Sequence, residues 1–372
     1  MSDNIVLFAG NVSAGYGKKI IADGISFTLE RGRVLTLIGP NGVGKSTVLK
    51  TITAQLRAIS GDISLCGNDL YGMDEKQRAK LMSVLLTDRI STERMTCGEV
   101  AAMGRYPYTG RFGVLDEKDR EIVKNAMELT NVYSLYERDF GRISDGQRQC
   151  VMLARAIAQQ PDVLVLDEPT SYLDISRKIS LLSVLRKLAD EKNIAVIQSL
   201  HELDLAQKFS DTVLCIKDGH ADKAGTPEEI FTDSYISQLY GIDCGSFNTL
   251  YGCSEPPAAA GKARVFVIGG AGTGIPVYRA LQRRGIPFAA GVLHENDIDI
   301  PAARALAAEV VTERAYEPIS EQSINRALEI IDGCEKVICC PESFGTGNKG
   351  NERLLNAAVG QNKIYDKKGL SQ

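Results

Sequence analysis

Nine residues near the start of the chain have the types and spacing of a phosphate-binding loop. They are Gly39-Pro40-Asn41-Gly42-Val43-Gly44-Lys45-Ser46-Thr47, which fit the pattern G-x-x-x-x-G-K-[ST]. Glycines let the backbone turn its N–H groups toward phosphate oxygens, and the start of a following helix adds positive potential. Lys45 would reach the β and γ phosphates, and Ser46 would offer its hydroxyl to magnesium. The stretch therefore predicts a site for a nucleoside triphosphate.

The elements on either side of this loop agree with that prediction. Residues Arg33–Ile38 are predicted to form a buried strand, and Lys45–Arg57 a helix with one apolar face. Further strands are predicted at Ile5–Leu7 and Ile25–Leu29, with turns at Asp23-Gly24 and Arg31-Gly32. The loop thus lies between a strand and a helix, the context in which this motif binds phosphate.

A second group of polar residues follows the apolar run Val163–Leu166. This run predicts a strand covered on both faces, and Asp167 and Glu168 come directly after it. Sheets of this kind bind ligands at the carboxyl ends of their strands, and neighbouring side chains point to opposite sides. Asp167 is therefore a candidate magnesium ligand, and Glu168 is a candidate to polarise a water molecule. His201 follows the next predicted strand, Ile194–Ile197.

Two motifs remain ambiguous when they are taken alone. Ser144 precedes a predicted helix, Cys150–Ala158, where it would cap the helix or, with the Gly146 amide, form a second anion site. The residues alone favour the cap. Tyr16 lies between two glycines, where it would stack on a base or simply occupy a turn.

The composition is that of a globular protein without a large net charge. The 372 residues are 44% hydrophobic and 24% charged with a net charge of −4, which predicts two or three domains and no electrostatic footprint for nucleic acid. No apolar run approaches the roughly 18 residues of a membrane span, and no signal peptide is predicted. We therefore expect a cytosolic protein. Nine cysteines without a C-x-x-C pair predict buried thiols, with neither disulfides nor zinc.

Together, these motifs resemble the ATP-binding subunit of an ATP-binding-cassette (ABC) transporter over residues 4–245. The resemblance identifies Tyr16 as the adenine-stacking aromatic, Ser144, Asp145, Gly146 and Gln147 as the signature sequence, Val163–Glu168 as the Walker B strand, Ser171–Asp174 as the D-loop with Asp174, and His201 as the switch histidine. It implies that two copies close head to tail on two ATP molecules. It also implies that Glu168 is the general base and that His201 contacts the γ-phosphate, with Lys45 on the phosphates.

Two positions depart from the usual pattern of that family. Thr87-Asp88 stand where the family has the glutamine of the Q-loop, so either Thr87 or Asp88 would replace it. Asp145 stands where the signature has glycine. Its carboxylate would lie near the partner's phosphates, which costs energy unless it turns away or pairs with a base such as Arg148.

Residues 101–107 and 199–206 resemble the subgroup that serves importers of ferric siderophores, haem and cobalamin. This implies a subunit that hydrolyses ATP with magnesium and powers import through a separate membrane permease, on the inner face of the cell membrane. Its partners would be a second copy, the permease and, indirectly, an extracytoplasmic binding protein, with no nucleic acid. The alternatives are a soluble ABC ATPase acting on DNA or ribosomes, and a regulatory module that binds ATP without turnover.

The predicted fold is an α/β P-loop cassette, residues 1–245, with a helical insertion at about 88–160. In that insertion, Thr96 and Glu99 are predicted to form a capping box. A linker at 246–261 would lead to a small Rossmann-like parallel α/β domain at 262–372. A glycine loop there, with Gly270, Gly272 and Gly274, would bind a ligand or only permit tight turns, and Ser343–Gly350 is a second such loop.

Overall fold

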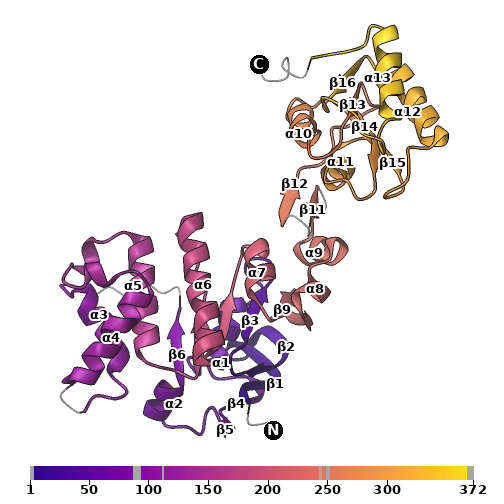
Figure 1. Cartoon of the computed structure of the whole chain (residues 1–372). Coiled ribbons are helices and arrows are strands. Elements are labelled where there is room, and N and C mark those ends of the chain that lie inside the picture. The colour runs from indigo at the N-terminus through magenta and orange to yellow at the C-terminus, as the bar shows by residue number, and fades with distance from the viewer. Residues whose placement is uncertain (1–3, 87–93, 111–112, 243–244, 249–251, 367–372) are drawn as a thin grey trace. The chain divides into compact units, whose positions relative to one another are not determined.

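The chain forms two compact units, Met1–Tyr240 and Gly241–Gln372. The computed structural model describes residues 4–86, 94–110, 113–242, 245–248 and 252–366. Figure 1 shows both units with their elements labelled. Each unit has its own hydrophobic core.

The described residues of the first unit build one ten-stranded sheet in the order β5-β4-β1-β2-β10-β9-β3-β8-β7-β6. Its strands are β1 (Ile5–Tyr16), β2 (Lys19–Glu30), β3 (Val34–Ile38), β4 (Ser60–Leu65), β5 (Asn68–Asp69), β6 (Met82–Leu85), β7 (Val163–Leu166), β8 (Ala195–Ser199), β9 (Thr212–Lys217) and β10 (His220–Gly225). From β9 through β3, β8 and β7 to β6, neighbouring strands are parallel. The carboxyl ends of β3, β7 and β8 therefore meet at one edge of the sheet, which brings the loops after them together.

The strands β3 and β7 are buried at every position, as their apolar runs predict. The N-terminal strands are longer than predicted, because β1 and β2 pair along twelve residues each. The turn predicted at Asp23-Gly24 is wrong: β2 continues through it, and a shift in the register with β1 absorbs the irregularity. Tyr16 accordingly ends a strand and does not lie in a loop.

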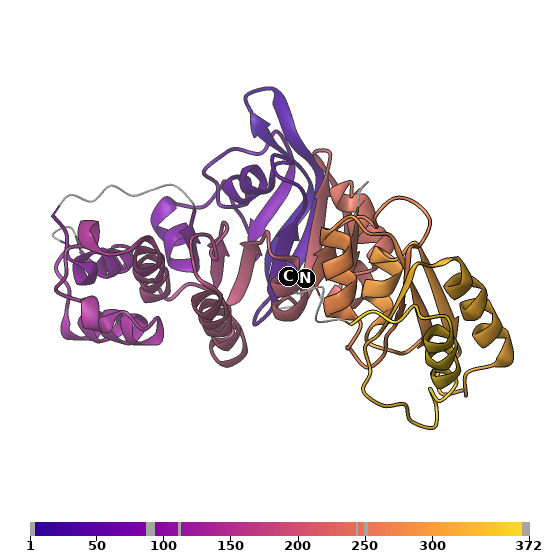
Figure 2. The same ribbon diagram turned by 90° about the horizontal axis from the view of Figure 1, so that it is seen from above.

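Helices of the first unit cover the sheet and form a separate group beside it. They are α1 (Lys45–Ile52), α2 (Glu75–Leu81), α3 (Cys97–Ala102), η1 (Met103–Arg105), α4 (Glu117–Leu129), η2 (Tyr133–Leu135), η3 (Phe140–Arg142), α5 (Asp145–Ala158), α6 (Ile175–Lys192), α7 (Leu203–Phe209), α8 (Pro227–Ile230) and α9 (Asp233–Tyr240). The helices α3, α4 and α5 pack on one another, and α5 also contacts β6. Figure 2 shows this group beyond the β6 edge of the sheet. The capping box of Thr96 and Glu99 at the start of α3 is confirmed.

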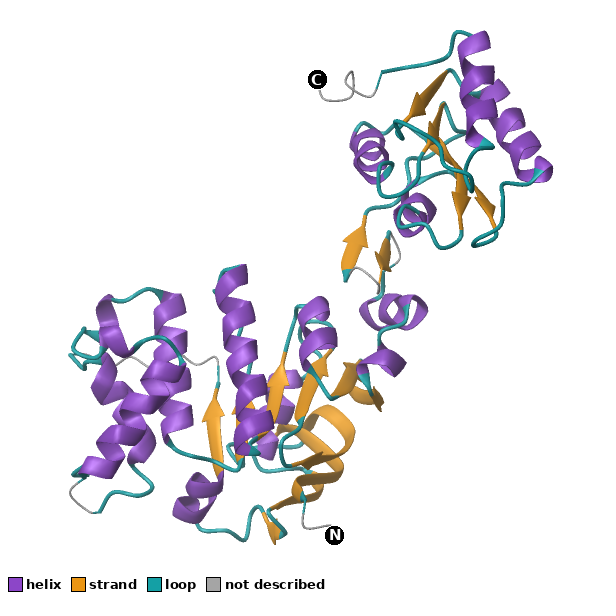
Figure 3. Ribbon diagram, in the orientation of Figure 1, coloured by secondary structure: helices purple, strands orange, loops and turns teal. Residues whose placement is uncertain are grey.

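The second unit contains a four-stranded parallel sheet in the order β15-β14-β13-β16. Its elements are β13 (Val265–Ile268), α10 (Ile275–Arg283), β14 (Phe288–His294), α11 (Ile300–Leu306), β15 (Glu309–Glu313), α12 (Glu321–Gly333), β16 (Lys336–Cys339) and α13 (Asn351–Gly360). One apolar core lies under α10 and α11, and another lies under α12 and α13. Figure 3 shows helices on both sides of these strands, which confirms the predicted Rossmann-like arrangement.

The stretch predicted as a linker, 246–261, contains folded structure. Two short strands, β11 (Ser246–Asn248) and β12 (Cys253–Glu255), pair antiparallel within it. The side chain of Glu255 is 6% exposed and forms an ion pair with Arg279 on α10. A buried carboxylate needs a partner, and this ion pair holds the strand pair to α10.

Candidate functional site

The loop Gly39–Thr47 connects the carboxyl end of β3 to α1 through glycines in left-handed conformations. Gly39, Gly42 and Gly44 have φ angles of 146°, 82° and 104°, which disfavour any residue with a side chain. A Cβ atom at Gly39 would lie 2.1 Å from the carbonyl oxygen of Ile216. Among the described residues, no side chain caps the start of α1. A phosphate group would supply the acceptor that the first N–H groups of this helix need.

Lys45 is held by the carbonyl groups of its own loop. Its Nζ donates hydrogen bonds to the oxygens of Gly39 at 2.7 Å and Pro40 at 2.9 Å. Burial lowers the pKa of Lys45, while the carboxylates of Glu168 and Asp167 oppose that shift. Phosphate oxygens would replace neutral acceptors by charged ones, which form the stronger hydrogen bonds.

The two carboxylates after β7 have different partners. Asp167 is 1% exposed and accepts a hydrogen bond from Ser199 Oγ at 2.6 Å. Glu168 has a φ of 49°, and its Oε1 lies 2.5 Å from Nε2 of His201. Its other oxygen, Oε2, accepts from Ser171 Oγ at 3.1 Å. The fold thus brings Glu168 and His201 into direct contact beside the glycine loop.

The donors available here fit a magnesium ion bound together with a nucleotide. Magnesium prefers oxygen ligands and keeps several from phosphate and water. Asp167 offers a buried carboxylate, and Ser46, on the first turn of α1, offers a hydroxyl. In the part of the chain that the structure describes, no group of three or more His, Cys, Asp or Glu residues could hold a metal by itself. A bound nucleotide would therefore have to supply the remaining ligands.

Ser144 caps α5, and the capping box is complete. Its Oγ accepts from the N–H of Gln147 at 3.3 Å, and the side chain of Gln147 accepts from the N–H of Ser144 at 3.0 Å. The cap uses the oxygen of Ser144 as an acceptor, so the hydroxyl hydrogen can still be donated to an anion. The two interpretations of Ser144 are therefore compatible.

Asp145 is paired with Arg148, which is one of the two expected arrangements. Arg148 Nη1 donates to Asp145 Oδ1 at 2.9 Å, and Arg148 Nη2 donates to the carbonyl oxygen of Gly141 at 2.8 Å. The ion pair gives the carboxylate a counter-charge within its own helix. Asp145 can therefore occupy the first turn of α5 at a smaller electrostatic cost to a nearby phosphate.

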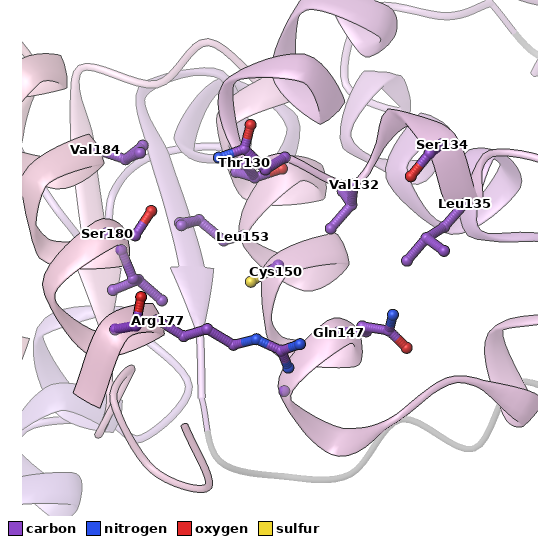
Figure 4. Close-up of a pocket in the computed structure, with 14 residues that line it drawn as sticks. Thr130, Val132, Ser134, Leu135, Gln147, Cys150, Leu153, Arg177, Ser180 and Val184 are labelled. Atoms are coloured by element: carbon purple, nitrogen blue, oxygen red, sulfur yellow. The ribbon is translucent and has the colours of Figure 1, made fainter. Parts of the chain in front are cut away.

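A pocket of about 250 Å³ lies between the start of α5 and α6. Figure 4 shows the side chain of Arg177 extending across this pocket toward Gln147. A Cβ atom at Gly146 would lie 2.8 Å from Arg177 Nη1, so glycine leaves room for the guanidinium. Asp174 caps α6 by accepting from the N–H of Arg177 at 2.9 Å. Arg177 therefore lies between Asp174, which the resemblance predicts as the D-loop residue, and Gly146 in the first turn of α5.

Comparison with known proteins identifies the family. A family model described as ABC transporter matches residues 22–171. An uncharacterised ABC transporter ATP-binding protein of Methanocaldococcus jannaschii is 41% identical over 284 residues, which cover 76% of this chain and 98% of that protein. The chain belongs to the ABC transporter ATP-binding proteins. The resemblance and the fold class predicted from the motifs are thereby confirmed.

Other relatives of this ABC protein carry more specific names. The cobalamin import ATP-binding protein BtuD of Halobacterium salinarum is 30% identical over 359 residues, which cover 95% of this chain and 89% of that protein. The iron(3+)-hydroxamate import ATP-binding protein FhuC of Bacillus subtilis is 37% identical over 229 residues, covering 62% of this chain and 85% of that protein. A solved ABC transporter described as metal-chelate type, in an inward-facing conformation, matches with a TM-score of 0.56 and 26% identity, covering 63% of this chain and 89% of its own. A model of the MJ0874 family matches residues 288–366.

Three further sets of predicted site residues are Thr87 with Asp88, Tyr16, and the glycines of the second unit. Thr87 and Asp88 lie outside the described residues. Tyr16 is 53% exposed at the end of β1, so its ring is accessible for stacking. In the second unit, the N–H groups of Gly270 and Gly274 already donate to Asp299 Oδ2 at 2.7 and 2.9 Å. Those two donors of the predicted ligand loop are therefore occupied.

Sequence reasoning missed Tyr240, the last residue of α9. The N–H of Gly39, at the start of the phosphate loop of this ABC cassette, donates to Tyr240 Oη at 3.1 Å. Burial raises the pKa of Tyr240 to about 12, so its hydroxyl stays protonated at neutral pH. The two residues are 201 positions apart, and no local pattern marks Tyr240. Only the tertiary fold reveals that it supports the loop.

Replacing Tyr240 by Phe should raise the KM for ATP several-fold while changing kcat little. The substitution keeps the ring and removes one hydrogen bond, which is worth about 0.5–1.5 kcal/mol. Tyr235→Phe is the matched control, because Tyr235 lies on the same helix but donates to Asp222 at 2.6 Å. Steady-state kinetics at varied ATP concentration would separate the two. Equal KM values for both variants would contradict a role for Tyr240 in the loop.

Replacing Arg148 by Ala should weaken ATP-dependent dimer formation about tenfold, because Asp145 would face the phosphates without its counter-charge. The substitution also removes hydrogen bonds to the backbone, so the second-site change Asp145→Gly provides the control. If charge is the cause, the double variant should dimerise at least as well as wild type in sedimentation experiments. A double variant as weak as Arg148→Ala would show that the backbone contacts dominate.

Proposed function

We propose that this chain is the ATP-hydrolysing subunit of an importer for a metal chelate, namely a ferric siderophore, haem or cobalamin. The observation that carries the catalytic part is the contact between Glu168 and His201, 2.5 Å apart, beside a phosphate loop. A carboxylate held by two partners at this edge is placed to accept a proton from water. The cargo class follows from the names of the relatives.

Each residue of the site has a distinct role in this proposal. Lys45 and the N–H groups of Gly39–Thr47 hold the phosphates, and Tyr16 stacks on the adenine. Glu168 takes the proton of the attacking water, while His201 orients Glu168 and contacts the γ-phosphate. A magnesium ion on Ser46 and Asp167 would neutralise charge on the phosphates.

A second copy of the chain would complete the site. The Ser144 hydroxyl and the N–H groups of Asp145 and Gly146, at the start of α5, have no acceptor within the helix. Two copies arranged head to tail would place these donors on the γ-phosphate bound by the other copy. The ion pair of Asp145 with Arg148 supports this arrangement, because it reduces the repulsion that the departure from glycine introduces.

The proposed partners are a membrane permease and, indirectly, an extracytoplasmic binding protein, with the chain bound to the inner face of the membrane. Among the described residues, no helix has both the length and the apolar character required to cross a membrane. The test is reconstitution of the chain with its permease and binding protein in vesicles. We expect ATP-dependent accumulation of a labelled ferric siderophore, haem or cobalamin, which Glu168→Gln abolishes. ATP hydrolysis without accumulation of any of the three would overturn the cargo class.

A further inference from the structure

The glycine loop of the second unit is closed to phosphate by the chain's own carboxylate. Asp299 is fully buried, and it accepts from the N–H groups of Gly270, Gly274 and Ile275 at 2.7, 2.9 and 3.2 Å. These N–H groups surround the start of α10, where dinucleotide-binding folds hold a pyrophosphate. A phosphate would have to displace the buried carboxylate of Asp299 from these N–H groups. The two negative charges would also repel each other.

A separate pocket lies beside this loop, with a volume of about 390 Å³. All four loops that follow the parallel strands contribute to it: Ala271 after β13, Asp297 after β14, Tyr316 after β15 and Gly347 after β16. Parallel α/β sheets bind ligands at this carboxyl edge. The volume falls within the range of small-molecule sites, about 300–1,000 Å³.

The polar lining of this pocket mainly accepts hydrogen bonds. Asp297 is fixed in place, because its two carboxylate oxygens accept from the N–H of Ala271 at 3.1 and 3.0 Å. His294 Nε2 lies 2.8 Å from the carbonyl oxygen of Glu317, so this nitrogen carries a hydrogen and donates it there. The carboxylates of Asp297 and Glu317 give the lining a negative charge, which disfavours a phosphate there too.

Tyr316 is one of the residues that border the pocket. Tyr316 is 91% exposed, although an aromatic side chain usually buries most of its surface. An exposed ring at a ligand-binding edge can stack on a planar base. The carboxylate after the second strand of a dinucleotide-binding fold usually accepts hydrogen bonds from ribose hydroxyls, and Asp297 occupies the corresponding loop.

We propose that this pocket binds a nucleoside without a phosphate on the glycine loop. The ribose hydroxyls donate to Asp297, and the base stacks on Tyr316. Asp299 excludes the phosphate that a dinucleotide would place at Gly270–Gly274. The site is independent of the ATP site, since all of its residues belong to the second unit.

The test is calorimetric titration of the full chain with adenosine, guanosine, cytidine and uridine. We expect saturable binding of at least one nucleoside. Tyr316→Ala should weaken it about tenfold, and Asp297→Asn should weaken it as well. Val359→Ala is the control, because Val359 is also an exposed apolar residue of the second unit, at 61% exposure. Tyr16→Ala removes the proposed stacking partner of the adenine at the ATP site. It should leave nucleoside binding to the second unit unchanged, which separates this pocket from the ATP site.

The 5′-monophosphate of the bound nucleoside should bind more weakly than the nucleoside itself. Three results would overturn the proposal: no binding of any of the four nucleosides, tighter binding of the monophosphate, or binding that Tyr16→Ala abolishes. Asp297 also holds the glycine loop, so circular dichroism of Asp297→Asn would verify its fold. Tyr316→Ala removes an exposed side chain and keeps the proposal testable if Asp297→Asn fails to fold.

Discussion

Replacing Glu168 by Gln is expected to lower the rate of ATP hydrolysis by about 10²–10⁴-fold, the usual contribution of a general base. Gln has nearly the same shape but cannot accept the proton of the attacking water. It also keeps oxygen and nitrogen atoms near His201 and Ser171, so the local fold should persist. ATP binding should be retained, and closed dimers should accumulate because the nucleotide is not turned over. Phosphate release and sedimentation would measure the two effects.

Glu202→Gln is a matched control for this substitution. Glu202 lies next to His201 in the sequence, but its carboxylate forms an ion pair with Lys178 and accepts from Thr170 Oγ1 at 2.8 Å. Loss of the Glu202 carboxylate should lower the stability of the folded chain and leave the hydrolysis rate within a few-fold of wild type. If Glu168→Gln hydrolysed ATP as fast as wild type, the assignment of Glu168 as the general base would be wrong.

Lys45→Ala and Ser144→Glu should each abolish most of the hydrolysis, for different reasons. Lys45→Ala removes a cation from the phosphates, a loss of about 10–100-fold in ATP affinity for a charged hydrogen bond. Ser144→Glu would bring an additional carboxylate toward the phosphates of the partner copy, where like charges repel. Equilibrium binding should distinguish them, because an isolated Ser144→Glu chain still has an intact phosphate loop. Undiminished hydrolysis by Ser144→Glu would exclude α5 from the site.

Much of the ATP site could be predicted because its chemistry depends on short, contiguous patterns. The loop Gly39–Thr47 needs glycines at left-handed positions, and three of them have such φ angles. The run Val163–Leu166 predicts a buried strand whose end carries the carboxylates. The capping residues Thr96 and Ser144 also specify the starts of their helices locally. For Asp145 the sequence left two alternatives, turning away or pairing with a base such as Arg148, and the structure shows the pair.

Other features depend on contacts between distant residues, which no local pattern reveals. Asp299 fills the glycine loop of the second unit from a position 25 residues beyond Gly274. Glu255 is paired with Arg279, and this ion pair orders a stretch whose composition predicts a linker. A glycine in the sequence does not reveal whether it serves a ligand or the packing of the chain. At Gly274 a Cβ atom would lie 2.4 Å from the hydroxyl of Tyr278, so packing alone requires glycine there.

We infer that each hydrolytic site combines the phosphate loop of one copy with the first turn of α5 from another copy. Mixing Lys45→Ala chains with Ser144→Glu chains tests it, because each mixed dimer contains one fully intact site. We expect hydrolysis at about one quarter of the wild-type rate, since about half of the dimers are mixed and one of their two sites is active. A mixture that stays as inactive as its separate components would contradict the claim.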